Sequence, residues 1–250
     1  MKSKAILFGI NYQRDSNARL RGCANDVHNM AKYLKNTAKY ESVKVYTDEY
    51  DDYKVKGQSI VNSFYKLALD SHRYKLEKAW IHFSGHGCYI NDYNGDERDG
   101  KDECILPVDY NYCGVIHDDL IKRILRYFHP DTKVVCVFDC CHSGTIGDLR
   151  YRYLDRNNWC IENDNSKCRA DVILISGCLD RQTSADAYNV RGRWEFSGAM
   201  TSCLLMAMEK STNIMDIMDS LRTTLKNKRF TQIPQITSSR IINADEYHLC

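Results

Sequence analysis

Short apolar segments alternate with segments of helical periodicity along this 250-residue chain, and this alternation limits its fold more than any other feature. Five segments are short and rich in β-branched or aromatic residues, as buried strands are: residues 5–10, 42–46, 79–83, 133–138 and 171–176. Apolar residues recur at helical spacing in four others: residues 24–34, 120–128, 196–208 and 214–225. Strands that alternate with helices usually pair in parallel. The sequence therefore predicts an α/β fold, with a mostly parallel sheet, helices on both faces and functional residues at the carboxyl ends of the strands.

The composition is that of an ordinary globular protein. Apolar residues make up 43% and charged residues 27% of the chain, which favours one folded domain over disorder or a fibrous repeat. The net charge of +2 provides no attraction for nucleic acid or an anionic membrane surface. Apolar runs stay short of the roughly 18 residues that cross a bilayer. We therefore expect neither a nucleic-acid partner nor a membrane partner.

Cysteine usage indicates a reducing compartment. The chain has 12 cysteines, yet no CxxC pair or regular spacing organises them. The first apolar segment, residues 5–10, is short and leads into polar residues without a small-residue cleavage site, so we expect a strand there and no export signal. Reduced thiols and a cytoplasmic location are the resulting expectations.

Two polar segments interrupt the alternation. Residues 88–103 are acidic and contain glycine, and residues 145–170 are rich in Arg, Asn and Asp. Both are predicted to be long surface loops, which in a compact domain are usually functional or flexible.

Nucleophilic and basic groups follow the third and fourth predicted strands. The third leads into Ser84-Gly85-His86-Gly87 and the fourth into Asp139-Cys140-Cys141-His142-Ser143-Gly144. An imidazole can stabilise a thiolate, which attacks an acyl carbon, and can then protonate the leaving amine. The neighbouring glycines leave backbone N–H groups available to an oxyanion. We therefore predict a Cys–His pair at this edge of the sheet.

Other uses of these residues fit the sequence less well. His82 lies inside a strand and is expected to be packed, and His142 adjoins the thiol and is expected to point away. A phosphate-binding thiolate loop needs Arg six residues after the cysteine, where this chain has Gly147. A zinc site is disfavoured because Cys140 and Cys141 are adjacent, a poor spacing for tetrahedral ligands.

The two signatures resemble those of the metacaspases, which are caspase-like cysteine peptidases. Further matching segments occur in order along nearly the whole chain: residues 22–26, 102–103, 107–109, 117–120, 175–178, 182–186 and 198–201. The resemblance implies a caspase-like three-layer sandwich in a single domain over residues 1–250. A large-subunit-like part would end near residue 150, and a small-subunit-like part would begin at 171 after the connecting loop 145–170. The expected form is a short one, without the N-terminal extension of many relatives.

The resemblance also implies roles for individual residues. His86 would be the general base and acid, Cys141 the nucleophile, and the N–H groups of Gly87 and Cys141 would hold the oxyanion. Cleavage after Arg or Lys would follow from a pocket formed by Cys23, Asp26, Ser84 and Asp139, with Asp186 as a further candidate. Paired desolvated carboxylates select a guanidinium or ammonium and repel an Asp side chain. For Asp26 the sequence leaves a second role open, as a cap of the helix at 24–34.

Calcium is a further implication of the resemblance. The implied ligands are Asp102, Asp118, Asp119 and Asp148, and hard cations prefer several such carboxylates. For Asp118 and Asp119 the alternative is a favourable first helical turn, with Lys122 and Arg123 at pairing distance. An EF-hand starting at residue 92 is not expected, because its sixth position is Glu97, where that loop needs Gly.

The basic residues of the connecting loop suggest self-processing of a zymogen. The candidates are Arg150, Arg152, Arg156, Lys167 and Arg169. A solvated basic loop is the alternative. The resemblance thus implies a calcium-dependent cysteine endopeptidase that acts as a monomer on protein or peptide substrates. A non-proteolytic, calcium-responsive interaction protein on the same fold is the second candidate.

Overall fold

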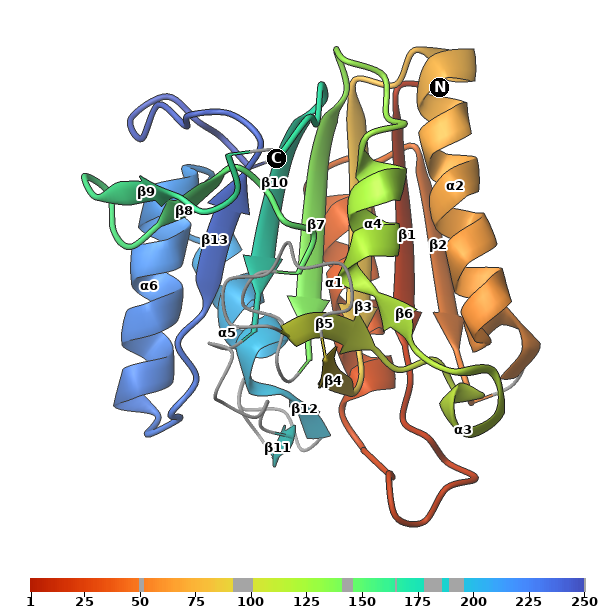
Figure 1. The fold of residues 1–250 in the computed structure, drawn as a ribbon. Helices are drawn as coiled ribbons and strands as arrows, with labels where there is room; N and C mark the ends of the chain where they lie inside the picture. The colour runs from red at the N-terminus through yellow and green to blue at the C-terminus, as the bar shows by residue number, and fades with distance from the viewer. Residues whose placement is uncertain are drawn as a thin grey trace.

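A large sheet forms the centre of the molecule (Figure 1). The computed structural model describes residues 1–49, 52–91, 101–140, 146–164, 166–177, 186–188 and 196–249. The strands of this sheet are β1 (Ser3–Gly9), β2 (Ser42–Thr47), β3 (Lys78–Ser84), β7 (Lys133–Asp139), β8 (Tyr151–Tyr153), β9 (Trp159–Ile161), β10 (Asp171–Ser176) and β13 (Gln235–Ser238). Their order is β2-β1-β3-β7-β10-β13-β8-β9. The first five pair in parallel and the last three pair antiparallel, which confirms the predicted mostly parallel sheet.

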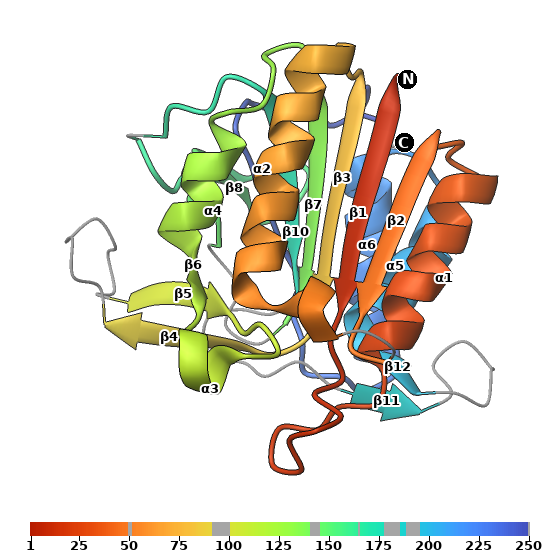
Figure 2. The ribbon, with the colours of Figure 1, turned by 90° about the vertical axis from the view of Figure 1, so that its right-hand side faces the viewer.

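Helices cover both faces of the sheet (Figure 2). One face packs against α1 (Cys23–Asn36), α5 (Ala199–Met208) and α6 (Ile214–Asn227), and the other against α2 (Gly57–Tyr74) and α4 (Asp118–Leu125). Successive residues of a strand point to opposite faces. Accordingly, Leu7 of β1 belongs to the core beneath α1, and Phe8 belongs to the core beneath α2. The molecule is therefore a three-layer α/β sandwich, as predicted.

The two segments expected to be surface loops contain additional strands, which corrects the sequence-based expectation. In the segment 88–103, strands β4 (Gly87–Asn91) and β5 (Lys101–Ile105) form a small antiparallel sheet with β6 (Ile116–His117). In the segment 145–170, β8 and β9 extend the edge of the main sheet. Edge strands with one solvated face tolerate charged residues. Arg152 of β8 pairs with Glu162 just beyond β9, and each strand spans only three residues, which is too short a run to be recognised from hydrophobicity.

Smaller elements complete the described chain. A 3₁₀ turn (Asp52–Val55) precedes α2, and the short helix α3 (Tyr110–Cys113) follows β5. Strands β11 (Asp186–Tyr188) and β12 (Phe196–Gly198) form a two-stranded sheet just before α5. Within these described ranges, no helix is both long and apolar enough to cross a membrane.

Candidate active site

The carboxyl ends of three neighbouring strands lie side by side at the lower edge of the sheet in Figure 1. Ser84, the last residue of β3, is in register with Gly9 of β1 on one side and Asp139 of β7 on the other. The Gly85 N–H donates to the Asp139 carbonyl at 3.2 Å. The segments that carry His86 and Cys141 therefore leave adjacent strand ends. Cys141 itself, with residues 142–145, lies outside the described residues.

The His86 imidazole is oriented by a backbone carbonyl. Its Nε2 lies 2.6 Å from the Ala18 carbonyl oxygen, in the segment between β1 and α1. A carbonyl oxygen only accepts hydrogen bonds, so Nε2 carries the proton and Nδ1 is the basic nitrogen of the neutral ring. The half-buried ring thus has one nitrogen held by the protein and the other suited to accept a proton.

Tyr12 packs against the His86 ring and forms a hydrogen bond with the backbone of the His86 segment. Its ring packs on the His86 ring with centroids 4.7 Å apart. Its hydroxyl accepts from the His86 N–H at 2.9 Å and donates to the Leu106 carbonyl at 2.7 Å. A Cβ at Gly85 would lie 2.9 Å from this hydroxyl, so glycine permits the approach. Burial raises the pKa of Tyr12 well above its ordinary value, which keeps the phenol protonated as a donor.

Two buried carboxylates lie close together at the end of β7, the strand beside the one that leads into His86. Asp26 of α1 accepts from the Ser84 hydroxyl at 2.8 Å and from the Gly198 N–H at 2.8 Å. Asp139 of β7 accepts from both the N–H and the hydroxyl of Thr201, at 2.9 and 2.7 Å. A Cβ at Gly198 would lie 2.6 Å from Asp26 Oδ2 and 2.5 Å from Asp139 Oδ2. The structure therefore places three of the predicted pocket residues close together, near the position of a side chain at residue 198: Asp26, Ser84 and Asp139.

The remaining pocket candidates are Cys23 and Asp186. Cys23 is buried at the start of α1. Asp186 is the backbone partner of Gly198 in the β11–β12 pair, and its side chain is outside the description. Asn11 accepts from the Cys23 and Ala24 N–H groups. The capping role that the sequence left open for Asp26 thus falls to Asn11.

His82 is packed, as predicted. It is fully buried in β3, and burial lowers its pKa to about 3. Its Nε2 lies 3.3 Å from the Thr201 hydroxyl oxygen. Since that hydroxyl donates to Asp139, the neutral His82 ring donates to Thr201 through Nε2. The ring therefore supports Asp139 indirectly.

The predicted calcium ligands lie around the N-terminal end of α4. Asp118, the first residue of α4, accepts from the Glu103 N–H at 2.9 Å, which joins it to the strand that carries Asp102. Burial, and then the nearby Asp148 carboxylate, raise the pKa of Asp118 to about 7. The Lys122 ammonium lies 2.8 Å from Asp148 Oδ2 and 3.9 Å from Asp119 Oδ1. The cluster is therefore acidic and buried, with a lysine between two of its carboxylates.

These aspartate carboxylates are the type of ligand that a hard cation prefers. Calcium binds several carboxylates at once, and the pKa of Asp118 is raised first by burial and then by the nearby Asp148 carboxylate. As the side chains stand, no three described acidic, histidine or cysteine residues are arranged to hold a metal ion. A cation that bound Asp148 would first have to displace the Lys122 ammonium. The residues thus fit calcium provided that Lys122 moves.

The structure divides the self-cleavage candidates into two groups. Arg150 pairs with Asp164, Arg152 with Glu162, and Arg156 with Asp216 and Asp245. Lys167 and Arg169 are exposed in an irregular segment. Of the first group only Arg152 lies within a strand, while Arg150 precedes β8 and Arg156 lies in the connection between β8 and β9, each held by its ion pairs. An exposed irregular segment is more accessible to a peptidase than residues held in this way.

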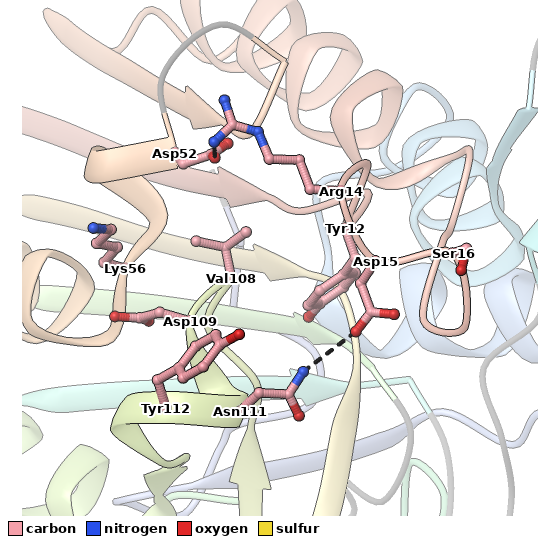
Figure 3. Close-up of a pocket in the computed structure, with 10 residues that line it drawn as sticks. All are labelled: Tyr12, Arg14, Asp15, Ser16, Asp52, Lys56, Val108, Asp109, Asn111 and Tyr112. Atoms are coloured by element: carbon pink, nitrogen blue, oxygen red, sulfur yellow. Dashed lines mark hydrogen bonds and ion pairs between the residues drawn. The ribbon is translucent and has the colours of Figure 1, made fainter.

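A separate cavity of about 510 Å³ lies between the segment after β1 and helix α3 (Figure 3). Its charged groups contact one another or polar neighbours. Arg14 pairs with Asp52 at 2.6 Å, and Asp15 accepts from Asn111 at 3.4 Å. Tyr12 lines this cavity, but neither Asp26 nor Asp139 does. It is therefore distinct from the acidic point beside Gly198.

Three groups at this site have no role in the sequence-based prediction. They are the Tyr12 hydroxyl, the Ala18 carbonyl and Thr201. Thr201 lies in a matching segment, 198–201, which is the only sequence signal for it. Tyr12 and Ala18 belong to the irregular segment between β1 and α1, where no periodicity marks them. A backbone carbonyl carries no sequence signal at all.

The fold and the strand-end residues define a class, the caspase-like cysteine peptidases. Residues 3–150 match the family model described as "Metacaspase, peptidase C14 domain". The chain is 33% identical to Metacaspase-1 of Yarrowia lipolytica, over 95% of this chain and 62% of that protein's length. It is 32% identical to Metacaspase-3 of Trypanosoma brucei brucei, over 97% of this chain and 72% of that protein.

A solved structure matches the fold independently. A protein from Geobacter sulfurreducens superposes with a TM-score of 0.67 at 22% identity, covering 99% of this chain and 97% of that one. The chain belongs to the metacaspase family, and it is a cysteine peptidase of the C14 type.

Proposed function

We propose that this metacaspase is a calcium-dependent endopeptidase that cleaves after Arg or Lys through His86 and Cys141. The single observation that carries the specificity is the convergence of the Asp26 and Asp139 carboxylates beside Gly198. Two desolvated carboxylates that lie this close repel each other, and a guanidinium or ammonium between them removes that repulsion. An acidic residue before the cut would add a third negative charge.

The chemistry needs one proton carrier and one nucleophile. The Cys141 thiol gives its proton to His86 Nδ1, the resulting thiolate attacks the carbonyl carbon, and the N–H groups of Gly87 and Cys141 stabilise the oxyanion. His86, held at Nε2 by Ala18, gives a proton from Nδ1 to the leaving amine as the C–N bond breaks. Water then hydrolyses the thioester, with His86 Nδ1 accepting its proton.

Calcium would be held by Asp102, Asp118, Asp119 and Asp148. Its charge would replace the Lys122 ammonium at Asp148 and stabilise the charged form of Asp118, whose pKa is raised first by burial and then by Asp148. Asp102 lies on β5, the partner of β4, which begins at Gly87. Binding would therefore order the small sheet next to the proposed oxyanion donor.

Peptide substrates test this function directly. Fluorogenic peptides ending in Arg, Lys or Asp are incubated with the protein, with and without calcium. We expect cleavage of the Arg and Lys peptides only with calcium, and loss of cleavage in the His86→Ala and Cys141→Ala variants. The exposed His28→Ala substitution serves as the matched control. Cleavage of the Asp peptide alone would contradict the acidic pocket, and no cleavage at all would favour the interaction-protein alternative.

Self-processing follows from the same specificity. Lys167 and Arg169 are the preferred sites, because both are exposed outside the strands. We expect calcium to fragment the wild-type protein and to leave the Lys167→Gln/Arg169→Gln double variant intact, with Arg150→Gln as a control that still fragments. Fragmentation of purified Cys141→Ala protein on adding calcium would argue against cleavage by its own site.

A further inference from the structure

Two cysteines face each other across the β4–β5 hairpin, outside the proposed catalytic pair. Cys88 of β4 and Cys104 of β5 are direct partners in the antiparallel register. Both are free thiols, and a side-chain hydrogen bond joins them. Cys104 is fully buried, whereas Cys88 is partly exposed. The exposed member of the pair can therefore meet a reagent, and the buried member can react only with its neighbour.

The geometry of the hairpin suits a disulfide. Directly opposed residues of an antiparallel pair have Cα atoms about 4.5–5.5 Å apart, inside the roughly 4.4–6.8 Å range of disulfides. Rotation of the two side chains would bring the sulfurs together without a change in the backbone register. None of the other described cysteines has a cysteine as its strand register partner.

We propose that Cys88 and Cys104 form a reversible oxidation site, at which a peroxide converts the two thiols into a disulfide across the hairpin. The Cys88 thiolate attacks one peroxide oxygen, the O–O bond breaks, and a sulfenic acid and water form once a proton is taken up. The Cys104 thiol then attacks the sulfenic sulfur, loses its proton and releases a second water. Peroxide is reduced by two electrons and the thiol pair is oxidised by two.

The neighbouring thiol also prepares Cys88 for this step. The hydrogen bond from Cys104 lowers the pKa of the Cys88 thiol, and the thiolate is the reactive form. Cys113 is exposed on α3, but its pKa is raised by the Asp109 carboxylate. If exposure alone decided which thiol reacts with peroxide, Cys113 would be favoured. The position of Cys88 opposite Cys104 favours Cys88 instead.

The position of the pair gives the crosslink a structural consequence. Strand β4 begins one residue after His86, and the Leu106 N–H that follows β5 donates to the His86 carbonyl at 3.0 Å. Strand β5 also carries Asp102. A disulfide at residues 88 and 104 would close the hairpin covalently and restrict opening of the segment that supports His86.

Mass spectrometry of the oxidised Cys141→Ala protein tests the proposal, since that variant removes the proposed nucleophile and its own oxidation. The protein is treated with hydrogen peroxide, free thiols are blocked, and it is digested with trypsin. Cleavage after Arg98 and Lys101 separates the two cysteines, so a disulfide appears as two linked peptides. Dithiothreitol should separate these peptides again.

Two variants assign the link. Trypsin leaves Cys104 and Cys113 on one peptide, so the Cys113→Ser variant should retain the linked species and the Cys88→Ser variant should lose it. Amide hydrogen exchange of residues 85–106 should slow several-fold in the oxidised protein and recover after reduction. Linkage of Cys88 to another cysteine, or oxidation of Cys113 while Cys88 and Cys104 stay reduced, would overturn the proposal. These readouts do not depend on peptidase activity.

Discussion

The carboxylates of Asp26 and Asp139 meet at the position that a side chain at residue 198 would occupy. Helix α1 contributes one and strand β7 the other, and their Oδ2 atoms lie 2.6 and 2.5 Å from that position. Separate partners hold them: Ser84 and the Gly198 N–H hold Asp26, and Thr201 holds Asp139. Rigid carboxylates that share one point bind a planar cation better than either does alone. The proposed preference for Arg or Lys before the cut can therefore be measured by changing these two carboxylates.

Neutralising one carboxylate should weaken cleavage of basic substrates. For Asp139→Asn we expect kcat/KM for an Arg peptide to fall roughly 30- to 4000-fold, because losing one partner of a buried charge pair costs about 2–5 kcal/mol. Steady-state kinetics with the Arg peptide measures this. Asp131→Asn, at a side chain that is 90% exposed, should leave kcat/KM unchanged. Equal losses in both variants would argue against a specificity role for Asp139.

A methyl group at residue 198 should block the same pocket. The Gly198→Ala side chain would overlap both carboxylate oxygens, so we expect cleavage of Arg and Lys peptides to fall at least as far as in Asp139→Asn. The rate at which iodoacetamide modifies Cys141, followed by mass spectrometry, should stay within about twofold, since the added methyl group would meet the Asp26 and Asp139 carboxylates. Normal peptide cleavage by Gly198→Ala would place the pocket elsewhere.

Removing the Tyr12 hydroxyl should destabilise the His86 segment. In Tyr12→Phe the His86 N–H and the Leu106 carbonyl lose this partner, and leaving buried polar groups unsatisfied costs about 1–3 kcal/mol. Denaturant unfolding should show this loss, with a lower kcat beside it. Tyr112→Phe, at a residue that is 94% exposed, is the matched control and should change stability by less than about 0.5 kcal/mol. Equal stability and equal kcat in Tyr12→Phe and Tyr112→Phe would rule out a supporting role for the Tyr12 hydroxyl.

Stability should fall in acid because of His82. Its pKa is about 3 in the folded protein and about 6.5 when unfolded. Below pH 6.5 the unfolded chain therefore binds a proton that the folded chain does not. The free energy of unfolding should drop by about 1.4 kcal/mol per pH unit from this residue as pH falls toward 3. The His82→Phe variant should show a shallower acid slope by that amount, while His28→Phe, at an exposed histidine, should keep the wild-type slope.

Lys122 should compete with calcium. In Lys122→Met the buried Asp148 carboxylate loses its ammonium partner, so without calcium the protein should be less stable by about 3–5 kcal/mol. Calcium should restore that stability, and calorimetry should show tighter calcium binding than in wild type. Lys2→Met, whose side chain is 60% exposed, is the control for losing a surface lysine. Weaker calcium binding in Lys122→Met would mean that this lysine supports the site.

Local sequence patterns were enough for much of the fold. The β-branched segments correspond to β1, β2, β3, β7 and β10, and Asn213 caps α6 through the Met215 and Asp216 N–H groups, as its position indicates. Helices α2 and α3 and strands β4, β5, β6, β8, β9, β11, β12 and β13 were not predicted. Strands β8 and β9 span only three residues each, which is shorter than the runs of roughly 4–8 residues that mark a strand in a sequence.

The sequence by itself determined which residues are proposed to carry the chemistry, because His86, Cys141 and the acidic residues stand in short contiguous signatures at strand ends. Only the tertiary structure decided which distant groups meet them: the Ala18 carbonyl at His86, Thr201 at Asp139, and Lys122 at Asp148. The physical reason is that burial within one helix or strand produces a periodic pattern of apolar residues, and this pattern can be read from the sequence of that segment alone. Contacts between segments follow instead from strand order and register, which no single segment encodes.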